Sequence, residues 1–116
     1  MKYPIQLTGP VQRVLLAMLE DPTVQRYGLE ISKQADLETG TLYPVMARLE
    51  RVRWVESSWE DPELSINEGR PRRRYYRLTE NGAEQAWRAL ADISRARDKR
   101  RASLSPAQPG MLGISL

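Results

Sequence analysis

The sequence contains no cysteine and no histidine, and it has no long apolar run. The absence of cysteine excludes disulfides and thiolate nucleophiles, and the absence of histidine excludes imidazole catalysis and, with cysteine, the commonest zinc ligands. No segment approaches the roughly 20 apolar residues of a membrane span, and the first seven residues lack the apolar stretch of a secretory signal. We therefore expect a cytoplasmic protein with no membrane partner, no metal site and no cofactor.

The positive charge of the chain is concentrated in one short segment. The 116 residues contain 18 lysines and arginines against 15 aspartates and glutamates, which gives a net charge of +3. Residues 70–77 contain five arginines and no acidic residue, so the rest of the chain carries a net charge of −2. A local surplus of this kind is typical of a phosphate-binding surface. The five are Arg70, Arg72, Arg73, Arg74 and Arg77.

Apolar residues recur at helical spacing in three segments of the first half. A first helix is predicted to begin after Thr8, which can cap it, and to end before Pro22. A second covers about 27–35, where Gly28 allows a neighbouring backbone to come close. A polar turn over 36–40 follows, and two short helices around a tight turn indicate a helix-turn-helix. The third helix has an inward face of Leu42, Val45, Met46, Leu49 and Val52.

Two segments rich in strand-forming residues, 54–59 and 72–78, flank a polar stretch and predict a hairpin with a long, basic-ended tip. Thr79 then caps a last helix that is predicted to end near Arg101, and residues 102–116 are expected to be a flexible tail. Three helices, a hairpin and a long helix in this order predict a mainly α fold with a small β-hairpin. This is the plan of a winged helix-turn-helix with one added C-terminal helix.

Three runs of sequence resemble the PadR family of transcriptional regulators. They occur in the family's order over roughly residues 8–100, and the pairing of Tyr-Pro in the third helix with Gly-Arg-Pro before Tyr-Tyr-Arg-Leu-Thr is specific. The resemblance implies a DNA-binding domain over 1–78, a dimerisation helix over 79–101, and a homodimer that represses a promoter by binding a double-stranded DNA operator. The runs are Tyr27–Ile31, Gly40–Glu50 and Gly69–Gly82.

The expected DNA contacts lie on the third helix and the wing. A helix in the major groove offers short polar or cationic side chains near its N-terminus, and a residue one turn later reaches either a base or a phosphate. Wing arginines can follow the phosphate backbone or enter a narrow minor groove. Strand residues alternate faces, so part of the run pairs instead with Glu56 across the hairpin. The predicted contacts are Thr39, Thr41, Tyr43, Arg48, Arg70, Arg72 and Arg73.

The last helix carries more apolar side chains than a short helix needs to cover a core. Two interpretations of Trp87 stand side by side: packing on the first helix, or a place in a dimer interface. The resemblance implies that this helix pairs with its counterpart about a two-fold axis, and that a hydrophobic small-molecule effector could stack on Trp87 there. The predicted interface and effector contacts are Trp87, Leu90, Ile93 and Arg97.

Arg53 stands where such families usually place a glycine after the third helix. A residue with a Cβ pays on the order of 1 kcal/mol for the left-handed conformation that ends many helices. We therefore expect a differently shaped helix end and a changed entry angle of the hairpin.

Two other classes of function are open. The same fold could bind an acidic partner protein through the third helix, but the exposed Thr39, Thr41 and Arg48 are polar, which disfavours such an interface. An enzyme is disfavoured because no nucleophile–base pair, metal cluster or phosphate loop is visible, and Ser57 and Ser58 have no candidate base beside them. We accordingly expect no catalytic residue.

Overall fold

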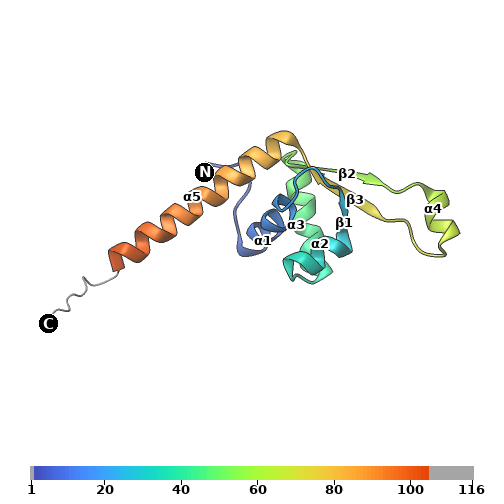
Figure 1. Ribbon diagram of the computed structural model, residues 1–116, viewed down its shortest axis with the longest axis horizontal. Helices are drawn as coiled ribbons and strands as arrows, with labels where there is room; N and C mark the ends of the chain where they lie inside the picture. Colours follow the sequence, from blue (N-terminus) through green and yellow to red (C-terminus); the bar gives the residue numbers. More distant parts are fainter. Residues whose placement is uncertain (1, 105–116) are drawn as a thin grey trace.

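Three helices pack around the hydrophobic core of the N-terminal half (Figure 1). The computed structural model describes residues 2–104. Helices α1 (Gly9–Leu19), α2 (Gly28–Ala35) and α3 (Thr39–Arg51) bury the apolar stripes that the sequence predicts, except that Val52 follows α3 and is only partly buried. The turn between α2 and α3 is shorter than predicted, because Thr39 and Gly40 already belong to α3. The fully buried residues of these helices include Val11, Val14, Leu15, Met18, Ile31, Leu42, Val45, Met46 and Leu49.

Side chains satisfy the ends of α1. The Thr8 hydroxyl accepts a hydrogen bond from the Val11 amide at 3.4 Å, so the predicted cap is confirmed. At the other end Arg26 is buried, and its Nη1 donates to the Met18 carbonyl at 3.0 Å. The last carbonyls of a helix lack partners within the helix, so this contact ties the chain after α1 back onto it.

A small antiparallel sheet lies beside the three helices. Its strands β1 (Arg26–Tyr27), β2 (Val55–Trp59) and β3 (Arg74–Leu78) are arranged in the order β1-β3-β2. The register pairs Val55 with Leu78 and Trp59 with Arg74, which confirms the predicted hairpin; we call residues 55–78 the wing. The two-residue β1 was not predicted, because so short a strand shows no alternation in sequence.

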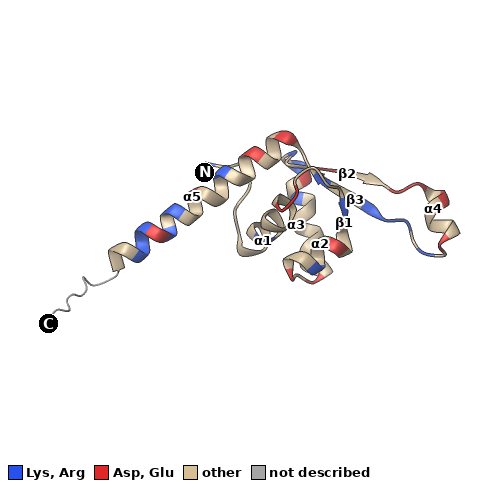
Figure 2. Ribbon diagram, in the orientation of Figure 1, with Lys and Arg blue, Asp and Glu red and all other residues tan. Residues whose placement is uncertain are grey.

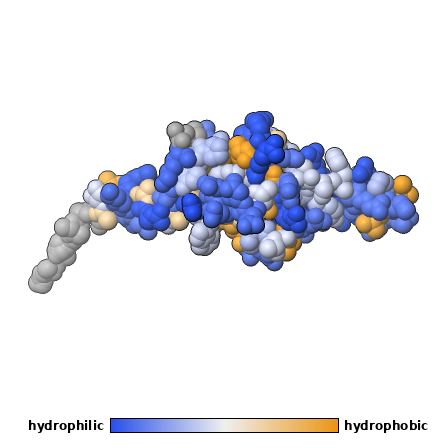
Figure 3. All heavy atoms as spheres, turned by 90° about the horizontal axis from the view of Figure 1, so that it is seen from above, coloured by the Kyte–Doolittle hydropathy of each residue, from blue (hydrophilic) through white to orange (hydrophobic). Residues whose placement is uncertain are grey.

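The tip of the wing is an acidic helix rather than the basic-ended loop that the sequence predicts. Helix α4 (Pro62–Asn67) begins after Asp61, whose carboxylate accepts a hydrogen bond from the Glu63 amide at 3.0 Å. Residues 61–68 contain three acidic residues and no basic one. Figure 2 shows acidic positions around α4 and basic positions on the segment that returns into β3. We call residues 60–70 the tip of the wing and residues 71–73 its arm. Figure 3 shows hydrophobic side chains exposed at this end, where Leu64 and Ile66 lie.

The end of α3 has the geometry usual for glycine, although the residue there is Arg53. Its φ is +63°, in the left-handed region. The Arg53 amide donates to the Glu50 carbonyl and the Trp54 amide to the Leu49 carbonyl, both at 3.0 Å, which is the Schellman pattern. The prediction of a differently shaped helix end is therefore wrong, since the arginine itself takes the strained conformation.

Helix α5 (Glu80–Leu104) begins in close contact with the end of α3. The Thr79 hydroxyl accepts a hydrogen bond from the Gly82 amide at 2.9 Å, as the predicted cap requires. A Cβ on Gly82 would lie 2.0 Å from the Trp54 carbonyl oxygen, so only glycine permits this approach. The helix runs to Leu104, so the prediction of a tail from residue 102 is wrong for 102–104; the remainder of that tail, 105–116, lies outside the described residues.

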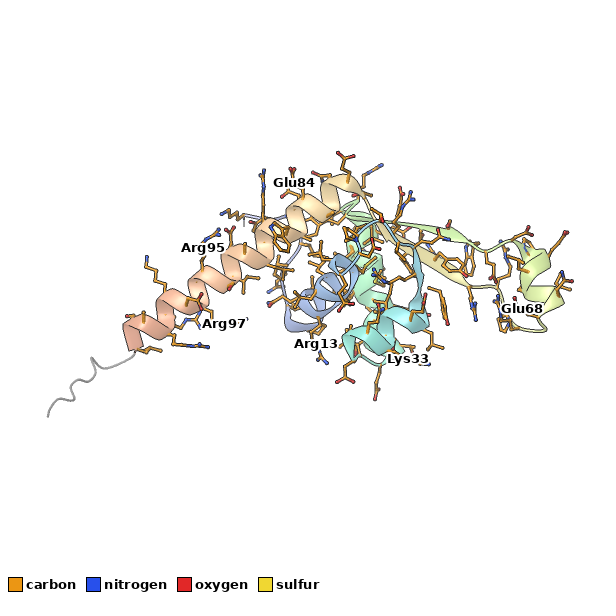
Figure 4. The ribbon with its side chains drawn as sticks, viewed as in Figure 1. Arg13, Lys33, Glu68, Glu84, Arg95 and Arg97 are labelled. Carbon is orange, nitrogen blue, oxygen red and sulfur yellow. The ribbon has the colours of Figure 1, made fainter. Side chains whose placement is uncertain are left out.

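The wing and α5 project from opposite sides of the three-helix core (Figure 1). Only Gly82, Ala86 and Ala89 of α5 are buried, and every residue from 94 to 104 is exposed. Figure 4 shows Arg97 on this projecting half of α5 and Glu68 at the far end of the wing. Within residues 2–104, no helix has both the length and the apolar character that crossing a membrane requires.

Candidate nucleic-acid interface

The outward face of α3 is polar and open. Thr39, Thr41 and Arg48 are exposed, as predicted, while the apolar residues between them point into the core. The first turn of the helix carries the two threonines, and Arg48 follows nearly two turns later. This face therefore presents short hydroxyl groups at the helix N-terminus and a cation further along, a pattern suited to base edges and phosphates.

Tyr43 occupies this face in a fixed position against α2. A Cβ on Gly28 would lie 2.5 Å from the Tyr43 hydroxyl and 2.8 Å from the ring, so the absence of a side chain at position 28 makes room for the tyrosine. The expectation that Gly28 admits a neighbouring backbone is wrong, because the neighbour is a side chain. Tyr43 remains 45% exposed, so its other side is accessible.

Arg70 is committed to an ion pair inside the wing. Its Nη1 and Nη2 donate to the two carboxylate oxygens of Glu60, each at 2.7 Å, and its Nε donates to Glu68 at 2.8 Å. The Glu60 side chain is only 3% exposed, and its Oε1 also accepts from the Arg73 amide at 3.2 Å. The hydrogen bonds from Arg70 hold the pKa of Glu60 at about 2, against an ordinary value of 4.5. Arg70 is one of the predicted DNA contacts; in the structure its guanidinium is bound instead by Glu60 and Glu68 of the wing.

Arg72 and Arg73 are arranged differently. Arg72 donates from Nε to the Glu60 carbonyl at 3.1 Å, and its guanidinium lies 5.5 Å from the centre of the Trp59 ring. The Arg73 guanidinium lies 4.2 Å from the centre of the Tyr27 ring. Among residues 2–104, no carboxylate lies within 4.0 Å of either guanidinium. Both cations are thus held by aromatic rings and have no anionic partner there.

The remaining wing arginines face acidic residues. Arg77 Nη2 lies 2.5 Å from Glu56 Oε1, which confirms that part of the run pairs with Glu56 across the hairpin. Arg74 Nη2 donates to the Ser57 hydroxyl at 2.9 Å and to Glu50 of α3 at 3.2 Å. This link between α3 and the wing was not predicted, because no sequence signal connects residues 24 positions apart. It connects the two elements of the candidate interface.

A groove lies where α2, α3 and the wing meet. We call it the wing groove; its volume is about 530 Å³. The residues that line it come from β1, the start of α2, the exposed face of α3, the end of β2, the arm before β3 and β3 itself. They include Tyr27, Tyr43, Trp59, Tyr76, Arg72 and Arg73. Tyr76 is buried, and Tyr27 packs edge-on against Tyr75 with ring centres 6.0 Å apart.

The four predicted dimer or effector residues lie along α5 in different environments. Trp87 is 68% exposed and lies outside the core, so its packing on the first helix is contradicted. Leu90 packs partly against the core, Ile93 is partly buried and Arg97 is exposed. The helix therefore exposes a large aromatic side chain to solvent that does not pack in the core of its own domain.

The N-terminal segment is tied to α5 at Asp92. Lys2 Nζ lies 2.8 Å from Asp92 Oδ2, and the Tyr3 hydroxyl donates to the same oxygen. These bonds lower the pKa of Asp92 to about 2 and raise the pKa values of Lys2 and Tyr3. Tyr3 also meets the Trp54 ring edge-on at 6.3 Å. This contact was not predicted, because its partners are about 90 residues apart in the sequence.

Solved structures of regulators share this fold. A transcriptional regulator from Clostridium thermocellum is 24% identical, with a TM-score of 0.64 over 85% of this chain and 97% of that one. The PcaV transcriptional regulator from Streptomyces coelicolor is 26% identical, with a TM-score of 0.67 over 86% of this chain and 67% of that one. The structure of PcaV in complex with its natural ligand is 26% identical to this chain, with a TM-score of 0.63 over 84% of this chain and 63% of that one. A comparison with curated proteins gives no match.

The fold is a winged helix-turn-helix with a C-terminal helix, as the sequence predicts. A family model described as the transcriptional regulator PadR-like family matches residues 15–88, which span α1 from Leu15, the wing and the start of α5. The predicted resemblance is thereby confirmed, and with it the general function of DNA-binding transcription regulation. The chain belongs to the PadR-like family of transcriptional regulators.

Proposed function

We propose that this chain is a homodimeric repressor that binds a specific double-stranded DNA operator and catalyses no reaction. The observation that carries the proposal is the juxtaposition of the open polar face of α3 with Arg72 and Arg73, which have no carboxylate partner in residues 2–104. In this scheme residues 1–78 bind DNA and α5 joins the two protomers.

Each part of the surface has a distinct task in the proposal. Thr39 and Thr41 approach base edges from the first turn of α3, with Tyr43 beside them, and Arg48 reaches a base or a phosphate. Arg72 and Arg73 bind phosphates from the arm of the wing. Guanidinium suits this role because its planar donors match phosphate oxygens. Arg70 stays on Glu60 and shapes the tip that positions them.

The acidic tip restricts how the wing approaches DNA. Helix α4 and its flanks carry Asp61, Glu63 and Glu68, which phosphates would repel. The arginine arm runs back from the tip towards the core (Figure 2). We therefore place the arm, rather than the tip, against the phosphate backbone, with α4 held away from the duplex.

The exposure of α5 supports the homodimer, because every residue from 94 to 104 is exposed. The wing and α5 both project, and the Cα radius of gyration is 19.3 Å, against about 13 Å for a compact chain of this length. A single helix projecting into water gains little from its intrinsic propensity and is ordinarily stabilised by packing. An isologous partner covering Trp87, Leu90, Ile93 and Arg97 would provide this packing and set two α3 helices about 34 Å apart, one turn of DNA.

An effector at this interface remains part of the proposal. PcaV has been solved with its natural ligand, and its structure resembles this chain at 26% identity. A flat hydrophobic molecule could stack on the exposed Trp87 once a second protomer closes the site. The alternative of an acidic protein partner at α3 is less well supported, because the exposed side chains of that helix are mainly polar.

Selection from a random duplex pool tests the proposal. Bound DNA is recovered, sequenced and re-measured by mobility shift against random duplex at the same salt concentration. We expect two related half-sites one helical turn apart, and a preference over random DNA of about a thousandfold or more. Equal binding of selected and random duplexes would show that the chain is not a sequence-specific regulator.

A further inference from the structure

The junction between β1 and α2 touches both halves of the candidate interface. Tyr27 is the last residue of β1, where it pairs with Tyr75 of β3, and it is also the N-cap of α2. Its ring lies under the Arg73 guanidinium of the arm, 4.2 Å from the ring centre. The next residue, Gly28, makes room for Tyr43 of α3. Two consecutive residues therefore contact one group of the wing and one group of α3.

Arg73 is held at both its backbone and its head group. Its amide donates to Glu60 Oε1 at 3.2 Å, and its carbonyl accepts from the Glu60 amide at 2.9 Å. The guanidinium lies against the Tyr27 ring, which itself packs edge-on against Tyr75. Within residues 2–104 this guanidinium donates no hydrogen bond. The position of the cation is thus defined while its N–H donors stay free.

A guanidinium stacked on a ring is well suited to bind a phosphate. The ring covers a face of the group, whereas the N–H donors lie in its plane and project from its edge. A side chain that is already ordered loses less conformational entropy when a ligand immobilises it. A lysine could not take this place, because an ammonium group has no flat face. Residues 70–77 contain five arginines and no lysine, which agrees with such a requirement.

We propose that Tyr27 is a positioning residue for DNA binding, which acts by holding the Arg73 guanidinium ready for a phosphate. With Gly28, it also sets where the arm stands relative to Tyr43 of α3. The proposal rests on the proposed function, in which Arg73 binds the DNA backbone. Trp59 stands in a similar but looser relation to Arg72, whose guanidinium lies 5.5 Å from its ring centre.

Nuclear magnetic resonance tests the stack without DNA. Protons that lie over the face of an aromatic ring resonate upfield, so the Arg73 side-chain protons should be shifted in the wild type and in Tyr27→Phe. The shift should disappear in Tyr27→Leu. Unshifted Arg73 protons in the wild type would overturn the proposal. A thermal melt checks that Tyr27→Leu folds, and Arg73→Lys, which leaves Tyr27 in place, provides a second variant for the binding measurements.

The salt dependence of DNA binding separates positioning from contact. Tyr27→Leu and Arg73→Lys should each weaken the selected operator and random duplex alike, by about fivefold for each protomer, because an unordered cation pays more entropy on binding. The slope of log affinity against log salt should keep its wild-type value in both, since no phosphate contact is lost. Arg73→Ala should lower the affinity and the slope together. Tyr27→Phe, the matched control, should bind within twofold of the wild type.

A double-mutant cycle decides whether Tyr27 acts through Arg73. Combined with Arg73→Ala, Tyr27→Leu should cost less than twofold in further affinity. A full fivefold loss in that background, or a loss in Tyr27→Phe as large as in Tyr27→Leu, would overturn the proposal. A wild type that prefers its selected operator while Tyr27→Leu binds as tightly defeats the positioning role alone. A wild type that binds selected and random duplexes equally defeats the proposed function as well.

Discussion

Two neighbouring parts of the wing carry similar arginines in opposite situations. At the tip, Arg70 forms two 2.7 Å bonds to the buried Glu60 and a third contact with Glu68. On the arm, Arg72 and Arg73 rest against aromatic rings and meet no carboxylate in residues 2–104. The number of arginines in a sequence therefore does not equal the number that can bind a ligand. An arginine whose donors are already bound to glutamates has few donors left for a phosphate.

Replacing both arm arginines should have the largest effect on DNA binding. In Arg72→Ala with Arg73→Ala, each lost charge-assisted contact costs on the order of tenfold in operator affinity, and a dimer loses each one twice. Random DNA should be weakened to the same degree, since phosphate contacts carry no sequence information. Mobility shift at fixed salt measures both. If the double variant bound DNA with the affinity of the wild type, the arm arginines would not be DNA contacts and would not differ from Arg70 at the tip.

Weakening the Arg70–Glu60 ion pair should instead reduce stability, with a smaller effect on DNA binding. Glu60→Gln weakens the pair at its buried end. The folded-state pKa of Glu60 is lowered to about 2, so its contribution to stability is present above the ordinary value of 4.5 and is lost as pH falls towards 2. Melting temperatures of wild type and Glu60→Gln should thus differ at pH 7 and converge towards pH 2. A constant difference would contradict the assignment.

Gly28→Ala tests the role of Tyr43 on the α3 side of the interface. The new methyl group would meet the Tyr43 hydroxyl at 2.5 Å, and the exposed tyrosine would have to move. We expect a change in sequence preference and a loss of operator affinity of a few-fold, with random DNA unaffected. Tyr43→Phe serves as the matched control, because it keeps the ring against Gly28 and removes only the hydroxyl. Equal losses on operator and random DNA would place Tyr43 outside base recognition.

Arg53→Gly should have the smallest effect on DNA and supplies a control for charge. Arg53 is an exposed arginine outside the wing, and its left-handed conformation suits glycine better, by about 0.5–1 kcal/mol net of the entropy of the unfolded chain. The free energy of unfolding in urea should rise by that amount while operator affinity changes less than twofold. A loss of operator affinity comparable to that of Arg72→Ala with Arg73→Ala would mean that arginines outside the wing contribute to DNA binding as much as those of the arm.

The sequence predicted the helix-turn-helix well because periodicity reports burial directly. The inward residues of α3 are buried, and Thr39, Thr41 and Arg48 are exposed, as the spacing requires. Thr8 and Thr79 cap the helices that they were expected to cap. Helix periodicity and helix capping depend on residues close together in the sequence, so a short stretch of sequence is enough to predict them.

The wing was predicted less completely, because residues distant in the sequence decide which of its arginines form ion pairs and which do not. Glu60 lies ten positions from Arg70, and Glu50 lies 24 from Arg74. One local signal was available: Asp61-Pro62 is a good start for a helix, and it marks α4. The environment of Trp87 needed the structure, since a helical pattern cannot show whether a domain or a second protomer covers a face.

The salt dependence of operator binding tests the central claim most directly. The slope of log affinity against log salt is measured for the wild type, for Arg72→Ala with Arg73→Ala, and for Arg53→Ala. Each phosphate contact contributes about 0.9 to the slope, so the double variant should lose about 1.8 per protomer while Arg53→Ala keeps the wild-type value. Three equal slopes would contradict the claim that the arm of the wing binds the DNA backbone.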